Sequence, residues 1–237
     1  MTWQNVAALG TISVAVVPNA LGQAAVSQAR AEIVNTAEEY LKLILAQGYR
    51  LPFRPGRDGK YPWGSNSFVL NNLVILGLAY DFSRQPKYVD GALDGMSYIL
   101  GVNAMGQSYV TSYGTRYLEY PHHRFWSWQV DKRLPKAPPG CVSGGPNSGL
   151  EDPYVQAAGL KACKPQKCFI DHIEAWSVNE ITINWNAPFA WVTAFLDEKS
   201  REAAAAKAAG KGPAGKAGPA KTRAGARKGA AGKQPGR

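Results

Sequence analysis

The sequence lacks several features that would place it quickly in a class of protein. Its 237 residues contain no run of 18 apolar residues, so no membrane-spanning helix is expected. No lysine or arginine precedes Arg30, so the weakly apolar first 22 residues lack the basic segment that opens a signal peptide. With only three histidines and three cysteines, the chain also has few side chains to offer a metal ion.

The three cysteines form no Cys-x-x-Cys pair. Cys163 and Cys168 flank a Lys-Pro-Gln-Lys loop and can close a small disulfide in an oxidising compartment, which would leave Cys141 unpaired. The spacing of the cysteines relative to His122, His123 and His172 fits no standard zinc pattern. We therefore expect no metal and no other cofactor.

The formal charge of +10 belongs almost entirely to one end of the chain. Residues 201–237 hold ten basic side chains and one acidic one, whereas the first 200 residues hold 17 and 16. The first 200 residues are thus nearly neutral, which argues against a domain that binds nucleic acid specifically.

The basic end consists almost entirely of Ala, Gly, Lys, Pro and Arg. Because it has no large apolar side chains to bury, residues 199–237 are predicted to be a disordered tail. Such a tail is either a passive solvated segment or an arm that binds polyanions non-specifically. Residues 1–198 are long enough for one folded domain.

Apolar residues recur at helical spacing through most of residues 1–198, and no strand alternation is seen. The pattern predicts helices over about 3–18, 23–47, 67–83, 86–100 and 187–197. Between 102 and 169, proline and glycine are frequent and Tyr, Trp, His and Arg cluster, which predicts long loops with few regular elements. This pattern indicates an all-α fold of toroid or solenoid type, with long loops on one side.

The stretch from Phe169 to Pro188 carries the chemistry of most interest. Asp171, His172, Glu174 and Glu180 lie there among aromatic side chains. A carboxyl group desolvated by indole rings has a raised pKa and sits beside a surface suited to a flat, weakly polar ligand such as a sugar ring. An amphipathic core helix explains the same spacing equally well.

Two gapped motifs favour the first interpretation. One comprises Ser108, Val110, Thr111, Gly114, Arg116, Pro121, His122 and Arg124. The other comprises Phe169, Asp171, Trp176, Glu180, Thr182, Asn186 and Ala187. Together, and in this order, they resemble the two signature regions of glycoside hydrolase family 9, the inverting cellulases with an (α/α)6 barrel. The resemblance covers about residues 1–198.

The resemblance implies a role for each candidate residue. Glu180 would be the general acid that protonates the leaving glycosidic oxygen. His122 and Arg124 would hydrogen-bond sugar hydroxyls beside the cleavage point. Asp171 would support the arrangement by orienting His122, Arg124 or a backbone donor.

Aromatic side chains would bind the sugar rings. Trp176 and Trp185 would desolvate Glu180. The candidate stacking platforms are Tyr113, Tyr117, Trp126 and Trp128, for which loop packing is an equal explanation. The other polar side chains near the motifs, His123, His172 and Glu174, are expected to be structural.

The sequence departs from the family in one respect. An inverting hydrolase needs a second carboxylate to activate water, and the family takes it from an Asp-x-x-Asp motif that does not occur here, since Asp90 and Asp94 have another spacing. Twelve barrel helices also need on the order of 400 residues. The resemblance therefore predicts a partial (α/α)6 barrel, the C-terminal part of the catalytic domain, which alone exposes apolar helix faces and hydrolyses cellulose poorly.

Three functions remain open at this point. The first is hydrolysis of β-1,4-glucosidic bonds in cellulose or a related β-glucan. The second is binding of carbohydrate or a protein partner without catalysis, and the third is polyanion binding through the tail. A cellulose substrate would imply a secreted or periplasmic location.

Overall fold

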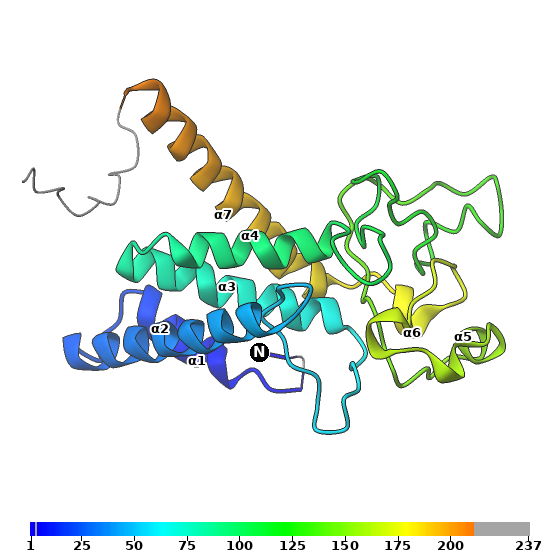
Figure 1. Ribbon diagram of the computed structural model, residues 1–237, viewed down its shortest axis with the longest axis horizontal. Helices are drawn as coiled ribbons and strands as arrows, with labels where there is room; N and C mark the ends of the chain where they lie inside the picture. The colour runs from blue at the N-terminus through cyan, green and yellow to red at the C-terminus, as the bar shows by residue number, and fades with distance from the viewer. Residues whose placement is uncertain (3, 211–237) are drawn as a thin grey trace, which may run out of the picture. The chain divides into compact units, whose positions relative to one another are not determined.

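The computed structural model describes residues 1–2 and 4–210 (Figure 1). Its regular elements are α1 (Ala7–Val16), α2 (Gln23–Ala46), α3 (Ser65–Ser83), α4 (Lys87–Ile99), α5 (Pro153–Ala157), η1 (Leu160–Ala162), η2 (Pro165–Lys167), α6 (Trp176–Asn179) and α7 (Ile183–Ala208). Within the described ranges, extended pairing is limited to isolated bridges. The first four predicted helices are confirmed to within a few residues, and the predicted loop region contains only short helices.

The first four helices form a packed layer in which sequence neighbours are also neighbours in space. α1 packs on α2, α2 on α3, and α3 on α4. Helix α3 is central and is buried over most of its surface, as its nearly continuous apolar sequence predicts. The connection from α2 to α3 and the long irregular region after α4 leave the layer at the same end (Figure 1).

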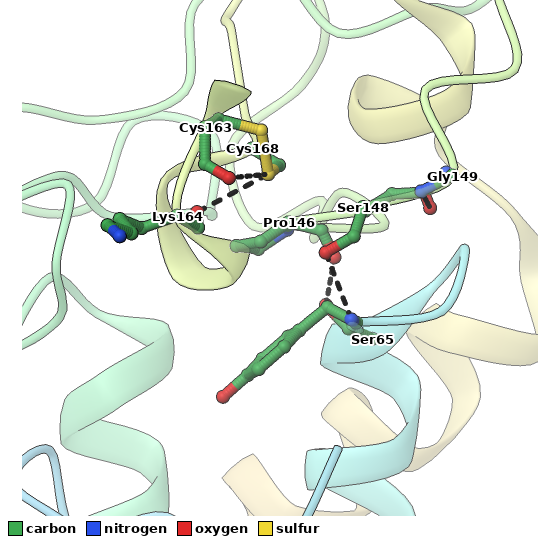
Figure 2. The surroundings of a disulfide bond; sticks show 9 residues. Ser65, Pro146, Ser148, Gly149, Cys163, Lys164 and Cys168 are labelled. Atoms are coloured by element: carbon green, nitrogen blue, oxygen red, sulfur yellow. Dashed lines mark hydrogen bonds between the residues drawn. A yellow bond between two sulfur atoms is a disulfide. The ribbon is translucent and has the colours of Figure 1, made fainter. Parts of the chain in front are cut away.

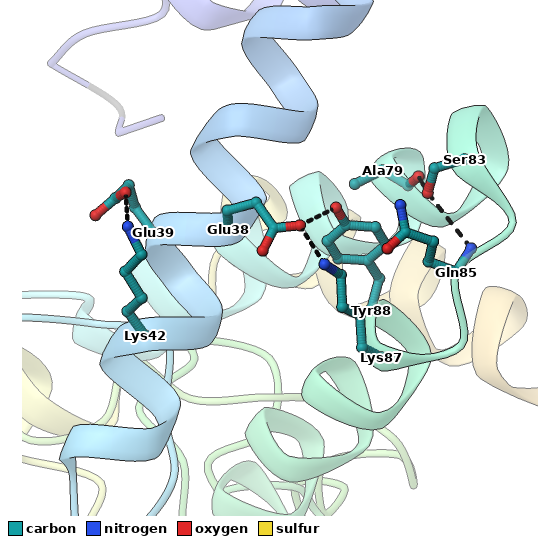
Figure 3. A network of polar contacts seen from close by, with 8 residues as sticks. All are labelled: Glu38, Glu39, Lys42, Ala79, Ser83, Gln85, Lys87 and Tyr88. Atoms are coloured by element: carbon teal, nitrogen blue, oxygen red, sulfur yellow. Dashed lines mark hydrogen bonds and ion pairs between the residues drawn. The ribbon is translucent and has the colours of Figure 1, made fainter. Parts of the chain in front are cut away.

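Hydrogen bonds between side chains link α2 to α4. The Glu38 carboxylate accepts hydrogen bonds from the Tyr88 hydroxyl and the Lys87 ammonium, both at 2.5 Å (Figure 3). Burial and the neighbouring Glu38 carboxylate raise the pKa of Tyr88 to about 12. Because Lys87 and Glu38 are both partly exposed, the ion pair contributes little, and the neutral hydroxyl is the firmer link.

The last helix differs from the sequence prediction at both ends. It begins at Ile183 rather than near residue 187. The Asn186 backbone N–H donates to the Thr182 carbonyl, so a helical turn already forms before Pro188. It continues to Ala208 through an alanine-rich stretch with high helix propensity. Disorder from residue 199 is therefore wrong for 199–208. Residues 211–237, where the rest of the expected tail falls, lie outside the described part.

The irregular region is organised around a buried segment, residues 142–147, which we call the inner segment. Its backbone N–H groups donate to the carbonyls of Tyr109, Val178 and Glu180, each at 3.0 Å, and one of its carbonyls accepts from the Asn66 backbone N–H at 3.0 Å. Buried backbone polar groups need partners of this kind. The inner segment thereby joins the start of α3 to both motif regions.

The Trp185 indole packs directly on two glycines, Gly144 of the inner segment and Gly64 just before α3. A Cβ atom added to Gly64 would lie 2.8 Å from the Trp185 ring, and one added to Gly144 would lie 2.7 Å from it. Trp185 is only 4% exposed. Glycine is therefore required at both positions for the indole to fit.

A disulfide braces the other end of the inner segment. Cys163 and Cys168 are joined, and the Cys168 carbonyl accepts a hydrogen bond from the Asn147 N–H at 3.0 Å. The Ser65 hydroxyl donates to the Pro146 carbonyl at 2.7 Å (Figure 2). The pairing is the one that the sequence allowed, and the partly buried Cys141 keeps a thiol.

Several apolar side chains on the helices face solvent, as expected for part of a barrel. Leu9 on α1, Leu45 on α2 and Leu93 on α4 are exposed, and Ile183 at the start of α7 is 89% exposed. An apolar hollow of about 650 Å³ also lies between the end of α4 and α7.

Replacing Gly144 with alanine should destabilise the fold. The added methyl group meets the Trp185 ring inside van der Waals contact, and overpacking of this kind typically costs about 1–3 kcal/mol. The matched control is Gly10→Ala in α1, where a Cβ meets nothing within 4 Å and helix propensity favours alanine by up to about 1 kcal/mol. Urea unfolding of both variants tests this, and equal stability of the two would contradict the packing.

Candidate active site

The structure places His122 and Glu180 side by side. They form an isolated parallel bridge, in which the His122 N–H donates to the Asn179 carbonyl at 2.9 Å and the Ile181 N–H donates to the His122 carbonyl at 3.3 Å. Residues paired in this way project their side chains from the same face. The two motifs found in the sequence therefore meet at these two residues.

The Glu180 carboxyl is set up to hold a proton. Partial burial raises its pKa above the usual range for glutamate, while the nearby His122 ring and Trp63 indole partly oppose that rise. The centroids of the Trp63 and Trp176 rings are 5.1 Å apart, so the two indoles form an aromatic wall, of which Trp63 is the part that neighbours the carboxyl. A glutamic acid with a raised pKa is the form that a general acid requires.

The His122 ring is held in one orientation. Its Nδ1 lies 2.6 Å from the Ile173 carbonyl oxygen. Because a carbonyl oxygen can only accept, Nδ1 carries the proton and Nε2 is left for a ligand. The Ile173 N–H in turn donates to the Gln129 side chain at 2.9 Å, which fixes that carbonyl.

Asp171 acts on the backbone, one of the alternatives expected from the sequence. Its carboxylate accepts hydrogen bonds from the N–H groups of Glu119 at 2.7 Å and Tyr120 at 2.9 Å. Burial raises the pKa of Asp171, and these N–H groups oppose the rise. The geometry suits a group that holds the 119–122 segment, and with it His122, in place.

Sequence reasoning missed the contribution of Asn179. This fully buried side chain donates from Nδ2 to the Tyr120 carbonyl at 2.7 Å and to the Asp171 carboxylate at 3.2 Å. Because Asn179 directly precedes Glu180, these bonds connect the backbone at Glu180 to the segment before His122. The position of Asn179 next to Glu180 was visible in the sequence, but Tyr120, one of its two partners, lies in a distant loop.

Helix α6, which precedes Glu180, is anchored by the buried Asp152. The Asp152 carboxylate accepts from the Ser177 N–H at 2.9 Å and the Ser177 hydroxyl at 2.5 Å. Its other oxygen caps α5 through the Val155 N–H at 2.8 Å. Three hydrogen bonds to this one carboxylate fix the turn that presents Glu180.

Two of the candidate stacking platforms already carry partners. The Trp126 ring stacks on His123 with centroids 3.9 Å apart. Lys132 and Lys136 place their ammonium groups 3.3 and 4.2 Å from the centroid of the Trp128 ring. A sugar that stacks on these indoles must use a face that the partners leave open.

The other candidates lie in different surroundings. Trp176 lines the wall beside Glu180, as described above. Tyr113 is exposed and borders the apolar hollow between α4 and α7. Arg124 and Tyr117 are exposed.

Within residues 1–2 and 4–210, no three metal-ligating side chains gather at one point. No helix of that part is long and apolar enough to cross a membrane.

Comparisons with known proteins show the family to which the chain belongs. Residues 1–193 match glycosyl hydrolase family 9, so the chain belongs to that family. A cellulose 1,4-beta-cellobiosidase from Acetivibrio thermocellus is 55% identical over 199 residues, which are 83% of this chain and 22% of that protein. Endoglucanase C from Cellulomonas fimi is 40% identical over 203 residues, 84% of this chain and 18% of that protein.

The fold comparison gives the same result. A crystal structure of a family 9 endoglucanase superposes with a TM-score of 0.71 at 31% identity, covering 83% of this chain and 35% of that one. The helices therefore form part of an (α/α)6 barrel. The chain spans about a fifth of the length of the two curated relatives and about a third of the solved one.

Replacing Asp171 with asparagine should loosen the 119–122 segment. An amide can accept only through one atom, so the N–H of Glu119 or Tyr120 loses its acceptor, at a cost of about 1–3 kcal/mol. Urea unfolding should show this loss, and the Glu119 and Tyr120 amides should exchange faster with D₂O. Exposed Asp90→Asn is the control and should change stability by no more than about 0.5 kcal/mol. Unchanged exchange in Asp171→Asn would rule out the support role.

The raised pKa of Glu180 predicts a pH-dependent effect on stability. A carboxyl whose folded pKa lies above its unfolded value favours folding when protonated, and this contribution is lost as pH rises through the folded pKa. Glu180→Gln stays neutral throughout. Its stability relative to the natural chain should therefore increase as the pH rises from the unfolded pKa of glutamate, about 4.3, through the higher folded pKa. Exposed Glu174→Gln should show no such trend in thermal unfolding, and a flat difference for Glu180→Gln would contradict the shift.

Proposed function

We propose that this chain provides the general acid of an enzyme that hydrolyses β-1,4-glucosidic bonds in cellulose or a related β-glucan with inversion. The observation that carries the proposal is the pairing of His122 with Glu180, a half-buried carboxyl of raised pKa between the two motifs. Names of the relatives support the substrate class, since they are a cellobiosidase and an endoglucanase.

The residues divide the reaction between them. Glu180, whose pKa is raised by burial, gives a proton to the glycosidic oxygen as the bond to the anomeric carbon breaks. The leaving sugar departs as an alcohol, and Glu180 is left as a carboxylate. His122 Nε2 and Arg124 hydrogen-bond the sugar hydroxyls, and the Trp63–Trp176 wall excludes water from the acid.

Inversion also needs a base that removes a proton from the attacking water. In inverting enzymes the two carboxyl groups are roughly 6.5–9.5 Å apart. The Asp171 oxygens already accept from Glu119, Tyr120 and Asn179, so Asp171 is not assigned this role. Of the two catalytic groups, the described residues therefore provide the acid.

A location outside the cytoplasm goes with this function. Cellulose is an extracellular polymer, and the Cys163–Cys168 disulfide persists best in an oxidising compartment. The neutral charge balance of the first 200 residues also suits a neutral polysaccharide.

Kinetics in a chimera test the acid. Residues 1–193 of this chain replace the matching segment of the Acetivibrio thermocellus relative, and Glu180→Gln is introduced. Turnover of an unsubstituted β-glucan should fall by about 10²–10⁴ because general acid catalysis is lost. Turnover of an aryl cellobioside with a strongly acidic leaving group should fall much less, because that group needs little protonation.

The matched control is Glu174→Gln, an exposed carboxylate on the same segment, which should leave both rates unchanged. Unchanged turnover of the unsubstituted glucan in Glu180→Gln would overturn the assignment. Equal losses on both substrates would show that Glu180 has a role other than proton donation.

A further inference from the structure

Positive charge gathers in one exposed loop, and the proposed reaction does not use it. Residues 126–136, which we call the basic loop, contain Lys132, Arg133 and Lys136 but only one acidic side chain, Asp131. Asp131 is already paired with Arg133, with a nitrogen–oxygen distance of 2.7 Å. The two lysines remain, and both are exposed. Among the residues that the structure describes, neither lysine forms an ion pair.

The two lysines approach the same indole. Nζ of Lys132 lies 3.3 Å from the centroid of the Trp128 ring, and Nζ of Lys136 lies 4.2 Å from it. The two ammonium groups are therefore no further apart than the sum of these distances. Like charges this close repel each other, and an anion bound between them removes the repulsion. A carboxylate is well suited to this position, because its two oxygens can accept one hydrogen bond from each ammonium.

Hydrogen bonds hold the indole of the basic loop in place. Two backbone N–H groups further along the loop both donate to the Ser127 carbonyl at 3.0 Å. The Gln129 side chain accepts from the Ile173 N–H at 2.9 Å. Both neighbours of Trp128 are therefore anchored, and a loop fixed in this way loses little conformational entropy when it binds a ligand.

The Tyr120 ring places the basic loop beside the candidate acid. It lies parallel to the Trp128 ring, with centroids 6.4 Å apart and an angle of 5° between the planes. The Tyr120 N–H donates to the Asp171 carboxylate, and His122, which pairs with Glu180, follows two residues later. A glucan chain bound at Glu180 therefore has the basic loop next to it.

The charges around this point leave a local positive excess. The exposed Glu119 carboxylate lines a small hollow together with Lys136 and offsets one positive charge. Arg124, just before the loop, adds another. Counting Arg124, Lys132 and Lys136 against Glu119 leaves two positive charges. Because the first 200 residues as a whole are nearly neutral, this excess acts locally and favours a negative charge on one part of an otherwise neutral ligand.

We propose that the basic loop binds a negatively charged substituent on the β-glucan, a carboxylate in the simplest case. The sugar unit at Glu180 stays neutral, and a unit beside it carries the charge. This inference rests on the proposed function, since it specifies the substrate of the same site. It makes Lys132 and Lys136 residues that determine specificity, and it extends the substrate class to acidic β-glucans.

The experiment uses the ¹⁵N-labelled 237-residue chain and NMR titration. Two soluble ligands of the same chain length are compared, which are cello-oligosaccharides with carboxymethyl groups and cello-oligosaccharides with neutral hydroxyethyl groups. Both should shift the Trp63 and Trp176 indole signals. Only the carboxymethyl ligand should also shift the amides of residues 126–136, and it should bind more tightly. Added salt should abolish the difference in affinity, because exposed charges are screened.

Single substitutions test the two lysines. Lys132→Gln and Lys136→Gln should each weaken binding of the carboxymethyl ligand about threefold to fivefold and leave the affinity for the neutral ligand unchanged. Lys161→Gln is the matched control, because Lys161 is also an exposed lysine but lies in η1. It removes the same charge and should change neither affinity. Equal losses in all three variants would overturn the inference, since net charge alone would then explain the binding.

The remaining outcomes separate this inference from the proposed function. Shifts at Trp63 and Trp176 with both ligands, and none at 126–136, would overturn the inference and leave the proposed function intact. Shifts by the carboxymethyl ligand that are confined to residues 211–237 would also overturn it. So would sodium acetate that shifts residues 126–136 at the same concentration, since the site would then take any small anion. No shift with either glucan ligand would count against both.

Discussion

Buried backbone N–H and carbonyl groups need hydrogen-bond partners, and this need determines how the irregular region folds. Residues 142–147 have no helix or sheet of their own, yet they are buried, so each N–H and carbonyl has to find a partner elsewhere. Tyr109, Val178 and Glu180 provide acceptors, and the start of α3 provides a donor. The positions of the two motif regions follow from this requirement. Side-chain chemistry at the site is therefore built on main-chain geometry.

Two other carboxyl groups hold the backbone on either side of the candidate acid. Asp171 accepts from the N–H groups of Glu119 and Tyr120, and Asp152 accepts from the N–H and hydroxyl groups of Ser177 in α6. Hydrogen bonds to ionised acceptors are stronger than hydrogen bonds between neutral groups. They hold residues 119–120 and the turn at Ser177 in place, although neither lies in a long helix or a sheet. Glu180 has no such set of donors, and this contrast explains how three acidic residues nearby in sequence and space serve different purposes.

Helix periodicity was sufficient to predict α1 to α4, because each buries an apolar face. It failed at α7, where Pro188 suggested a start and the composition of the alanine-rich stretch suggested disorder. The motifs predicted that His122 and Glu180 belong to one active site, and the structure pairs the two residues in a backbone bridge. The partners of Asp171, the place of Trp63 and the role of Asn179 were beyond sequence reasoning, because they depend on hydrogen bonds between loops far apart in the chain. No local propensity encodes such contacts.

The bridge between His122 and Glu180 has an evolutionary consequence. Once the main chain is fixed there and at Thr111, which exchanges backbone hydrogen bonds with Gly140 and Cys141, the excursion from 124 to 139 begins and ends at rigid points. The entropy of closing a loop grows only slowly with its length. Apart from Arg124 and from Gln129, which holds the Ile173 backbone behind His122, this excursion can therefore change its length and its aromatic and basic side chains without displacing the acid.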